Sequence, residues 1–231
     1  MRRTTRVLTS ASVVAVGLST WLVAGWGGEE TRDIMSNVAS VIFAAFATVS
    51  AGFAARSARG RKRLAWAFIG LGSAGWVVGS ALWMYYELIA DELPFPSLAD
   101  VGFLMFPPAV CIGLLLFLVG DVGHSRTRLV LDGMIAAAAL FQISWVAVLR
   151  DVYEAGGTSR FAFGLSLAYP IGDLVVITVA VMVLMRARSA ERRTLTILIG
   201  GVVLMALADS AFVYLSARDM YEGQIGRVVD V

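Results

Sequence analysis

The sequence predicts an all-α, polytopic transmembrane helix bundle that forms one multi-pass membrane domain over residues 1–231. Of the 231 residues, 58% are hydrophobic and 16% are charged, and the mean hydropathy is +0.78. A soluble domain normally carries about 25% charged residues. The chain is therefore too apolar for water and has the composition of a bilayer protein.

Apolar runs long enough to cross a bilayer occur about seven times, and only short links separate them. A spanning helix needs about 20 mostly apolar residues. The short links leave no room for a soluble domain. The expected spans are residues 7–26, 34–55, 64–89, 98–119, 129–149, 166–185 and 195–217.

The first apolar run follows three arginines and has two interpretations. Basic residues before an apolar run are typical of a signal peptide. This run is long for a signal peptide, however, and residues 23–26 make a poor small-x-small cleavage site. We expect an uncleaved first helix; cleavage would leave six spans in the same orientation.

The links between spans alternate in charge, which predicts how the chain crosses the membrane. With the N-terminus inside, 14 of the 19 Lys and Arg residues are cytoplasmic and 5 are external. Cytoplasmic loops are enriched in Lys and Arg, so we expect a cytoplasmic N-terminus. Seven spans then place the C-terminus outside.

Four carboxylates lie inside apolar runs, where charge is costly and usually marks a functional position. Asp100, Asp173 and Asp209 fall toward the outer ends of their spans in this topology. Asp132 is the exception, close to the cytoplasmic start of its span. The three outer aspartates are the main candidate site residues.

Three further polar residues fall near the same outer level, namely Tyr86, Glu87 and Tyr169. With the aspartates they predict a polar pocket open to the outside, suited to a small cation or to an amine- or hydroxyl-bearing ligand. A structural interpretation stays open. In it Asp100 caps its helix, the other two aspartates bond to Tyr or Ser across helices, and Glu87 is hydrated at the interface.

Two local patterns predict how the helices bend and pack. Pro107 and Pro108 lie inside the fourth span and should kink or break it, which makes them a candidate hinge. Gly75 and Gly79 form a small-xxx-small pattern that lets helices approach closely. A chance pair of glycines in an apolar helix is an equally good interpretation of the second pattern.

Residue counts exclude several functions. The only lysine, Lys62, lies in a link, so a retinal Schiff base in the last helix is excluded. The chain has one Cys and one His. It therefore cannot form an internal disulfide, a metal site of Cys and His ligands, or a bis-His haem site. The segment 170–173 departs from the Gly-x-Gly-Asp motif of aspartyl intramembrane proteases. We expect no enzyme activity, no catalytic residues and no cofactor. We also expect no nucleic-acid partner, because membrane topology and anionic lipid headgroups explain the basic links.

Five motifs occur in an order that resembles a known family. They are Trp83-Met84-Tyr85-Tyr86-Glu87-Leu88, Pro94-Phe95-Pro96-Ser97-Leu98-Ala99-Asp100, Leu131-Asp132-Gly133-Met134-Ile135, Ala168-Tyr169-Pro170-Ile171-Gly172-Asp173 and Ala208-Asp209. From about residue 35 on, the chain resembles the N-terminal integral-membrane sensory region of bacterial, especially actinobacterial, cyclic-di-GMP signalling proteins. Those proteins carry diguanylate cyclase (GGDEF) and often phosphodiesterase (EAL) domains.

The resemblance implies a multi-pass sensor domain in the bacterial plasma membrane that works as a homodimer. The chain departs from the family because it has no GGDEF or EAL sequence, and in the family an eighth span follows the phrase at 228–231. We expect a truncated product, a fragment or a stand-alone remnant. The leading hypothesis is a non-enzymatic input domain for a small extracytoplasmic ligand. A small ion-coupled transporter and a membrane assembly partner are the alternatives.

Overall fold

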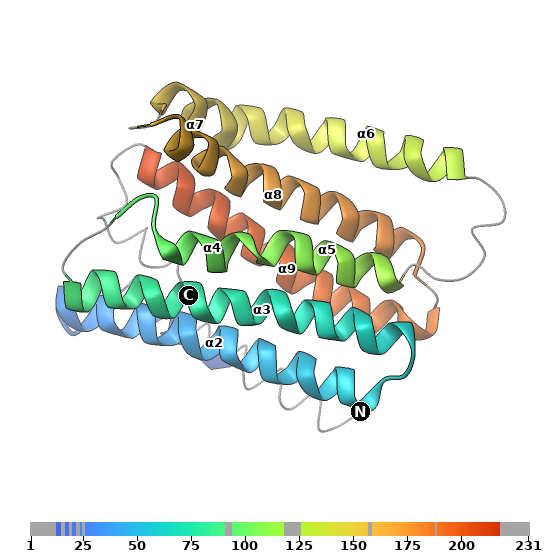
Figure 1. The fold of residues 1–231 in the computed structure, drawn as a ribbon, viewed down its shortest axis with the longest axis horizontal. Helices are drawn as coiled ribbons and strands as arrows, with labels where there is room; N and C mark the ends of the chain where they lie inside the picture. The colour runs from blue at the N-terminus through green and yellow to red at the C-terminus, as the bar shows by residue number, and fades with distance from the viewer. Residues whose placement is uncertain are drawn as a thin grey trace.

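The structure is a computed structural model that describes residues 26–90, 94–117, 126–156, 159–187 and 189–217, with isolated positions between 13 and 24. Its regular elements in these ranges are all helices, and the long ones run side by side (Figure 1). They are α2 (Glu29–Ser57), α3 (Arg61–Tyr85), η1 (Tyr86–Ala90), α4 (Leu98–Leu104), α5 (Phe106–Phe117), α6 (Arg126–Ser144), η2 (Trp145–Leu149), α7 (Arg150–Ala155), α8 (Arg160–Met185) and α9 (Ser189–Ala217). The two η segments are single π-helical turns.

Six segments in the described part of the chain are long and apolar enough to cross a membrane. They are Glu30–Ser57, Arg61–Ala90, Leu98–Phe117, Leu131–Glu154, Arg160–Met185 and Glu191–Ala211. Each overlaps one of the expected spans, from the second to the seventh. The all-helical fold is therefore confirmed, and six helices have the length and composition of membrane spans. The expected first span and the chain after residue 217 lie outside the described residues, apart from a few positions before residue 25.

Helix ends differ from the sequence prediction where capping, rather than hydropathy, decides them. Helix α8 begins at Arg160 instead of near residue 166, because Ser159 caps it. The Ser159 Oγ accepts a hydrogen bond of 3.1 Å from the Ala162 N–H. Such a cap satisfies one of the free donors at a helix start, so the helix extends beyond the apolar run.

The core lies between α5, α8 and α9. Its buried side chains are Val110, Cys111, Leu114, Val176, Ala180, Val183, Leu195, Ile199 and Val202. Helix α3 packs against α2 on one side and against α4 and α5 on the other, whereas α6 packs mainly on α8 (Figure 1). Helix α6 is therefore peripheral to the bundle.

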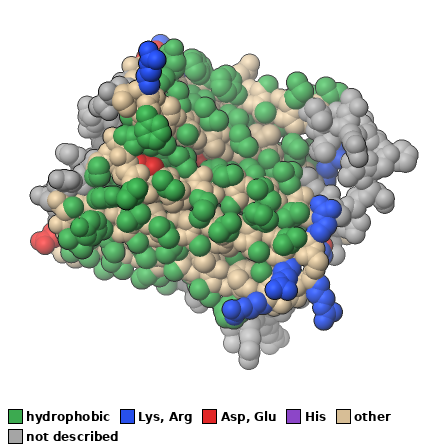
Figure 2. Space-filling view, viewed as in Figure 1, with side chains coloured by type: hydrophobic (Ala, Val, Ile, Leu, Met, Phe, Trp, Pro, Cys, Tyr) green, Lys and Arg blue, Asp and Glu red, His purple; other side chains and the backbone are tan. Residues whose placement is uncertain are grey.

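Large apolar side chains cover much of the outer surface (Figure 2). Phe53 of α2, Ile135 of α6 and Val146 of η2 are each more than half exposed. Water would disfavour so much exposed apolar area, whereas lipid accepts it. The surface therefore fits the membrane environment that the composition predicts.

Successive long helices run in opposite directions, so the α2–α3 and α8–α9 links lie at the same end of the bundle (Figure 1). We call this the basic end; these two links and the adjoining helix ends contribute Arg56, Arg59, Arg61, Lys62, Arg63, Arg186, Arg192 and Arg193. An ion pair between Lys62 of α3 and Glu191 of α9 joins two helices there. In Figure 2 most of the Lys and Arg side chains lie at the right, which is the basic end.

The expected close approach at Gly75 and Gly79 is confirmed, and a third glycine completes it. A Cβ atom added to Gly102 of α4 would lie 2.6 Å from the Gly75 oxygen and 2.6 Å from the Gly79 nitrogen. Helices α3 and α4 thus meet backbone to backbone. This contact fixes the position of the short helix that carries Asp100.

Candidate functional site: acids shared by α4, α8 and α9

Asp100 is held at the start of α4 by its own turn. The Ser97 N–H donates to Asp100 Oδ2 at 2.6 Å, and the Ser97 Oγ lies 3.1 Å from the same oxygen. The aspartate is only 7% exposed. Ser97 is the N-cap residue and Asp100 the third residue of the helix, so this is the carboxylate half of a capping box.

The second oxygen of Asp100 connects α4 to α8. The Tyr169 hydroxyl donates a hydrogen bond to Asp100 Oδ1. Asp100 therefore uses both carboxylate oxygens, one within its helix and one across to a neighbouring helix. Asp100 is therefore not the N-cap that the structural interpretation expected, because Ser97 holds that position and Asp100 bonds back to it from the first turn. The cross-helix bond adds a contact that this local bond does not require.

Asp173 lies one turn after Tyr169 on the same face of α8 and connects α8 to α9. It is 8% exposed, and the Ser210 Oγ donates to Asp173 Oδ2 at 3.0 Å. This is the expected Ser–Asp bond between helices. The two bonds together, Tyr169–Asp100 and Ser210–Asp173, tie three helices to one another.

Asp209 precedes Ser210 on α9 and completes the set. Its carboxyl group interacts electrostatically with both Asp173 and Tyr169, and its side chain is partly exposed. We call Asp100, Tyr169, Asp173, Asp209 and Ser210 the acid cluster. The two ion pairs found among the described residues lie elsewhere, so the acid cluster has no basic partner in that part of the chain.

The helix break expected at the two prolines is present next to the acid cluster. Helix α4 ends at Leu104 and α5 begins at Phe106. Pro107 and Pro108 lack the N–H groups that would continue the helix. A Cβ atom on Gly172, the neighbour of Asp173, would lie 3.1 Å from Pro107. The broken helix therefore packs directly on the α8 turn that carries Asp173.

A tryptophan spans the same break from the other side. The Trp76 ring of α3 lies 4.9 Å from the Phe103 ring of α4 and 5.5 Å from the Phe106 ring of α5, both edge to face. Such aromatic pairs are directional contacts. The two halves of the broken helix are thus held by one residue.

Two expected members of the pocket contact other residues instead. Glu87 accepts a hydrogen bond of 2.9 Å from the Asn37 side chain of α2, and the Tyr86 ring packs on Tyr85. Neither has a hydrogen bond to the acid cluster in the described part of the structure. Glu87 thus bonds to α2, and Tyr86 packs on its neighbour in the chain.

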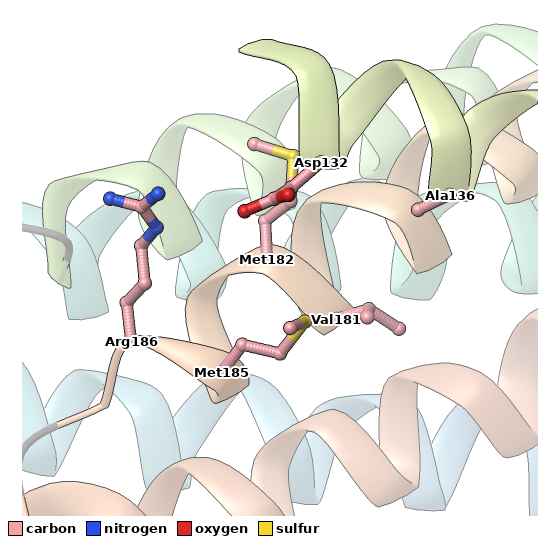
Figure 3. A pocket seen from close by; sticks show the side chains of 6 residues that line it. All are labelled: Asp132, Ala136, Val181, Met182, Met185 and Arg186. Atoms are coloured by element: carbon pink, nitrogen blue, oxygen red, sulfur yellow. The ribbon is translucent and has the colours of Figure 1, made fainter. Parts of the chain in front are cut away.

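Asp132 lies at the basic end, as its position in the sequence predicts. It lines a cavity of about 230 Å³ between α6 and α8 with Arg186 and four apolar or sulfur-containing side chains (Figure 3). A second hollow of about 430 Å³ lies on the outer surface beside Phe141, Gln142, Trp145 and Val146. Neither cavity is lined by the acid cluster.

The contacts define what the acid cluster can bind. In the described residues, no group of three His, Cys, Asp or Glu side chains is arranged to hold a metal ion. Asp173 and Asp209 together offer carboxyl oxygens as hydrogen-bond acceptors, with no ion pair to a described Lys or Arg. That chemistry suits a ligand with one positive charge or several hydroxyl donors.

Sequence reasoning did not assign a role to Ser97, Asn37 or Ser210. The signal for Ser97 was available, because a serine three residues before an acid is the capping-box pattern. The partners of Asn37 and Ser210 depend on helix rotation, which no local pattern specifies.

In comparisons with known proteins, no family model, no curated protein and no solved structure matches this chain.

Proposed function

We propose that this chain is a multi-pass, sensor-type input domain of a cyclic-di-GMP signalling protein in the bacterial plasma membrane, with no catalytic output of its own. The observation that carries the proposal is the contact between Pro107 and Gly172, which joins the break in α4–α5 to the acid cluster. A ligand at the acids would therefore act directly on a discontinuous helix. The family resemblance of the motifs supplies the signalling context.

The proposed orientation places the basic end in the cytoplasm and the acid cluster in the outer half of the membrane. This orientation is supported by the α2–α3 and α8–α9 links, which lie at one end and are rich in Lys and Arg. Lys and Arg favour the cytoplasmic side. With the N-terminus inside, the acid cluster lies nearer the extracytoplasmic side than the cytoplasmic side. A small external ligand is then the expected input.

The proposed mechanism is a change in packing between α4, α5 and α8. A ligand shifts such an equilibrium only if it binds one packing better than the other. Replacing the Tyr169–Asp100 or Ser210–Asp173 bond by a bond to the ligand would release one helix from its neighbour. Motion at Pro107 and Pro108 would transmit that release along α5 toward the basic end.

The ligand-binding role of the acids is tested with two probes, Na⁺ and ethylamine. We expect a saturating cationic probe to raise the Tm of the reconstituted full chain by about 5–10 °C, because a bound ligand stabilises the folded state by mass action. Asp173→Asn and Asp209→Asn keep the shape of the side chain but remove its charge, and they should abolish the shift. Glu30→Gln, an exposed acid on α2, is the matched control. If neither probe raises the Tm of the wild type by more than it raises the Tm of the two variants, the acids do not bind cations.

A small ion-coupled transporter is the second candidate, because transporters also combine intramembrane acids with broken helices. The acid cluster beside the α4–α5 break is the observation that favours it. Proteoliposomes with an internal pH dye separate the two functions. If the protein is a sensor, the internal pH changes as slowly as in empty liposomes. If it is a proton-coupled transporter, the internal pH changes faster, and Asp173→Asn abolishes the increase in rate.

A homodimer is the proposed assembly state, and α6 is its proposed interface. Only 6% of the apolar window of Leu131–Glu154 is buried, against 44% for Leu98–Phe117. Gln142 lies near the middle of the charge-free stretch 133–149, its side chain is exposed, and it has no hydrogen bond to any described residue. Lipid tails offer no hydrogen bond, whereas a glutamine amide can both donate and accept. The same amide on a second copy would satisfy it.

Gln142→Leu is therefore expected to weaken self-association in liposomes about five- to thirtyfold, because hydrogen bonds between membrane helices contribute about 1–2 kcal/mol in model peptides. Gln142→Asn keeps the amide and should retain most of the association. Single-molecule photobleaching at several protein densities measures the dimer fraction. A wild type that stays monomeric at every density, or a dimer indifferent to Gln142→Leu, would contradict this interface.

A further inference from the structure

The cavity between α6 and α8 combines two opposite charges at the edge of the apolar spans. Asp132 is the second residue of the spanning segment Leu131–Glu154, and Arg186 directly follows the segment Arg160–Met185. Both side chains are exposed. At the ends of spanning segments the surroundings are lipid headgroups rather than lipid tails.

Neither charge is neutralised within the described protein. The ion pairs found there are Lys62–Glu191 and Arg150–Glu154, and neither Asp132 nor Arg186 has a hydrogen bond to another described side chain. Figure 3 shows the Asp132 carboxylate reaching down from α6 and the Arg186 guanidinium reaching up from the end of α8 toward the same opening. Among the described side chains, neither group has an ion-pair or hydrogen-bond partner in this space.

The geometry of α6 creates this space. A Cβ atom added to Gly133 would lie 2.7 Å from the Met182 sulfur, so α6 approaches α8 closely at that point. Asp132 is thereby brought over α8, beside a cavity of about 230 Å³. The remaining walls are Ala136, Val181, Met182 and Met185. Methionine side chains adapt to irregular apolar ligands, and such a wall suits the first carbons of an acyl chain.

We propose that this cavity binds the headgroup of a zwitterionic phospholipid with a primary ammonium group, of the ethanolamine type. The Asp132 carboxylate would accept hydrogen bonds from the ammonium, and the Arg186 guanidinium would donate to the phosphate in its planar, forked geometry. An anionic lipid would meet repulsion from Asp132. A choline headgroup has no N–H to donate. The site is independent of the acid cluster and of the proposed sensory function.

The test measures which lipid stays bound to the full chain. The protein is purified in detergent and exposed to equal amounts of phosphatidylethanolamine, phosphatidylcholine and phosphatidylglycerol with the same acyl chains. Native mass spectrometry then counts the retained lipids. We expect phosphatidylethanolamine to be retained about tenfold better than phosphatidylcholine, a difference of about 1.4 kcal/mol, because only the ethanolamine ammonium can donate hydrogen bonds to Asp132.

Variants assign the preference to the cavity. Asp132→Asn should reduce phosphatidylethanolamine retention to the level of phosphatidylcholine, and Asp132→Glu should keep the preference. Arg186→Gln should weaken both lipids about equally, since both carry the phosphate. Ala136→Leu fills the cavity without changing charge and should weaken all three lipids. Arg192→Gln, an exposed arginine at the same end that does not line the cavity, is the control.

Three results would overturn the proposal. Equal retention of the three lipids by the wild type would show that the cavity does not select a headgroup. A preference for phosphatidylethanolamine that survives Asp132→Asn would place the lipid elsewhere. Stronger retention of phosphatidylglycerol than of phosphatidylethanolamine would show an anionic-lipid site that depends on the arginine alone.

Discussion

Replacing Asp100 by alanine is expected to lower the free energy of unfolding by about 2–4 kcal/mol. The change removes the acceptor of the Ser97 N–H at the start of α4 and leaves the Tyr169 hydroxyl without its partner. Losing a helix cap costs about 1 kcal/mol, and leaving the part-buried Tyr169 hydroxyl unpaired costs about 1–3 kcal/mol. Unfolding in mixed detergent micelles measures the change.

A double-mutant cycle isolates the bond between α4 and α8. Tyr169→Phe removes the hydroxyl and should cost about 1–3 kcal/mol in the wild type but much less in Asp100→Ala. Tyr153→Phe removes an exposed hydroxyl and should change stability by less than about 0.5 kcal/mol. Additive effects of Asp100→Ala and Tyr169→Phe would mean that the two side chains are not coupled.

Gly102→Ala is expected to destabilise the protein by about 3 kcal/mol, because the added methyl group has no space. Its carbon would lie 2.6 Å from two backbone atoms of α3, which cannot move as a flexible side chain can. Helix α4 must then shift away from α3. We also expect Asp100 to move with α4, so that the coupling to Tyr169 falls in the Gly102→Ala background.

Gly200→Ala is the matched control for this prediction. Gly200 also lies inside a long helix, but nothing lies within 4 Å of a Cβ atom added there. Alanine favours a helix over glycine by about 0.5–1 kcal/mol, so this variant should be neutral or slightly stabilising. Equal effects of the two substitutions would contradict the close packing of α3 on α4.

The sequence was sufficient to predict the architecture because a bilayer imposes strong constraints. Long apolar runs predict the spans, and the helix-breaking prolines predict the interruption before Pro107. The glycine spacing in α3 correctly predicted a close approach, although it did not identify Gly102 as the partner. Each of these predictions depends on residues within a single helix.

Contacts between helices were harder to predict, because they depend on helix order and rotation. Depth alone grouped Glu87 with the aspartates, but its carboxylate faces Asn37 of α2. Tyr169 and Asp173 share a face through their four-residue spacing, yet nothing in the sequence shows that this face meets both Asp100 and Ser210. The membership of the acid cluster therefore required the structure.

The central claim is that the acid cluster controls packing at the α4–α5 break. Spin labels at Val101 and Leu115, both exposed, flank the break in a Cys111→Ala background. Fourteen residues of continuous helix would span about 21 Å, a distance that pulsed electron paramagnetic resonance resolves. Labels at the exposed residues Val38 and Phe53 of the continuous helix α2 form the control pair.

In proteoliposomes, we predict that Asp173→Asn combined with Asp209→Asn shifts the distance distribution between residues 101 and 115 and leaves that between 38 and 53 unchanged. Such a result would couple the acids to the break. Identical 101–115 distributions in the wild type and the double variant would contradict the claim and leave the acid cluster as a structural cross-link between helices.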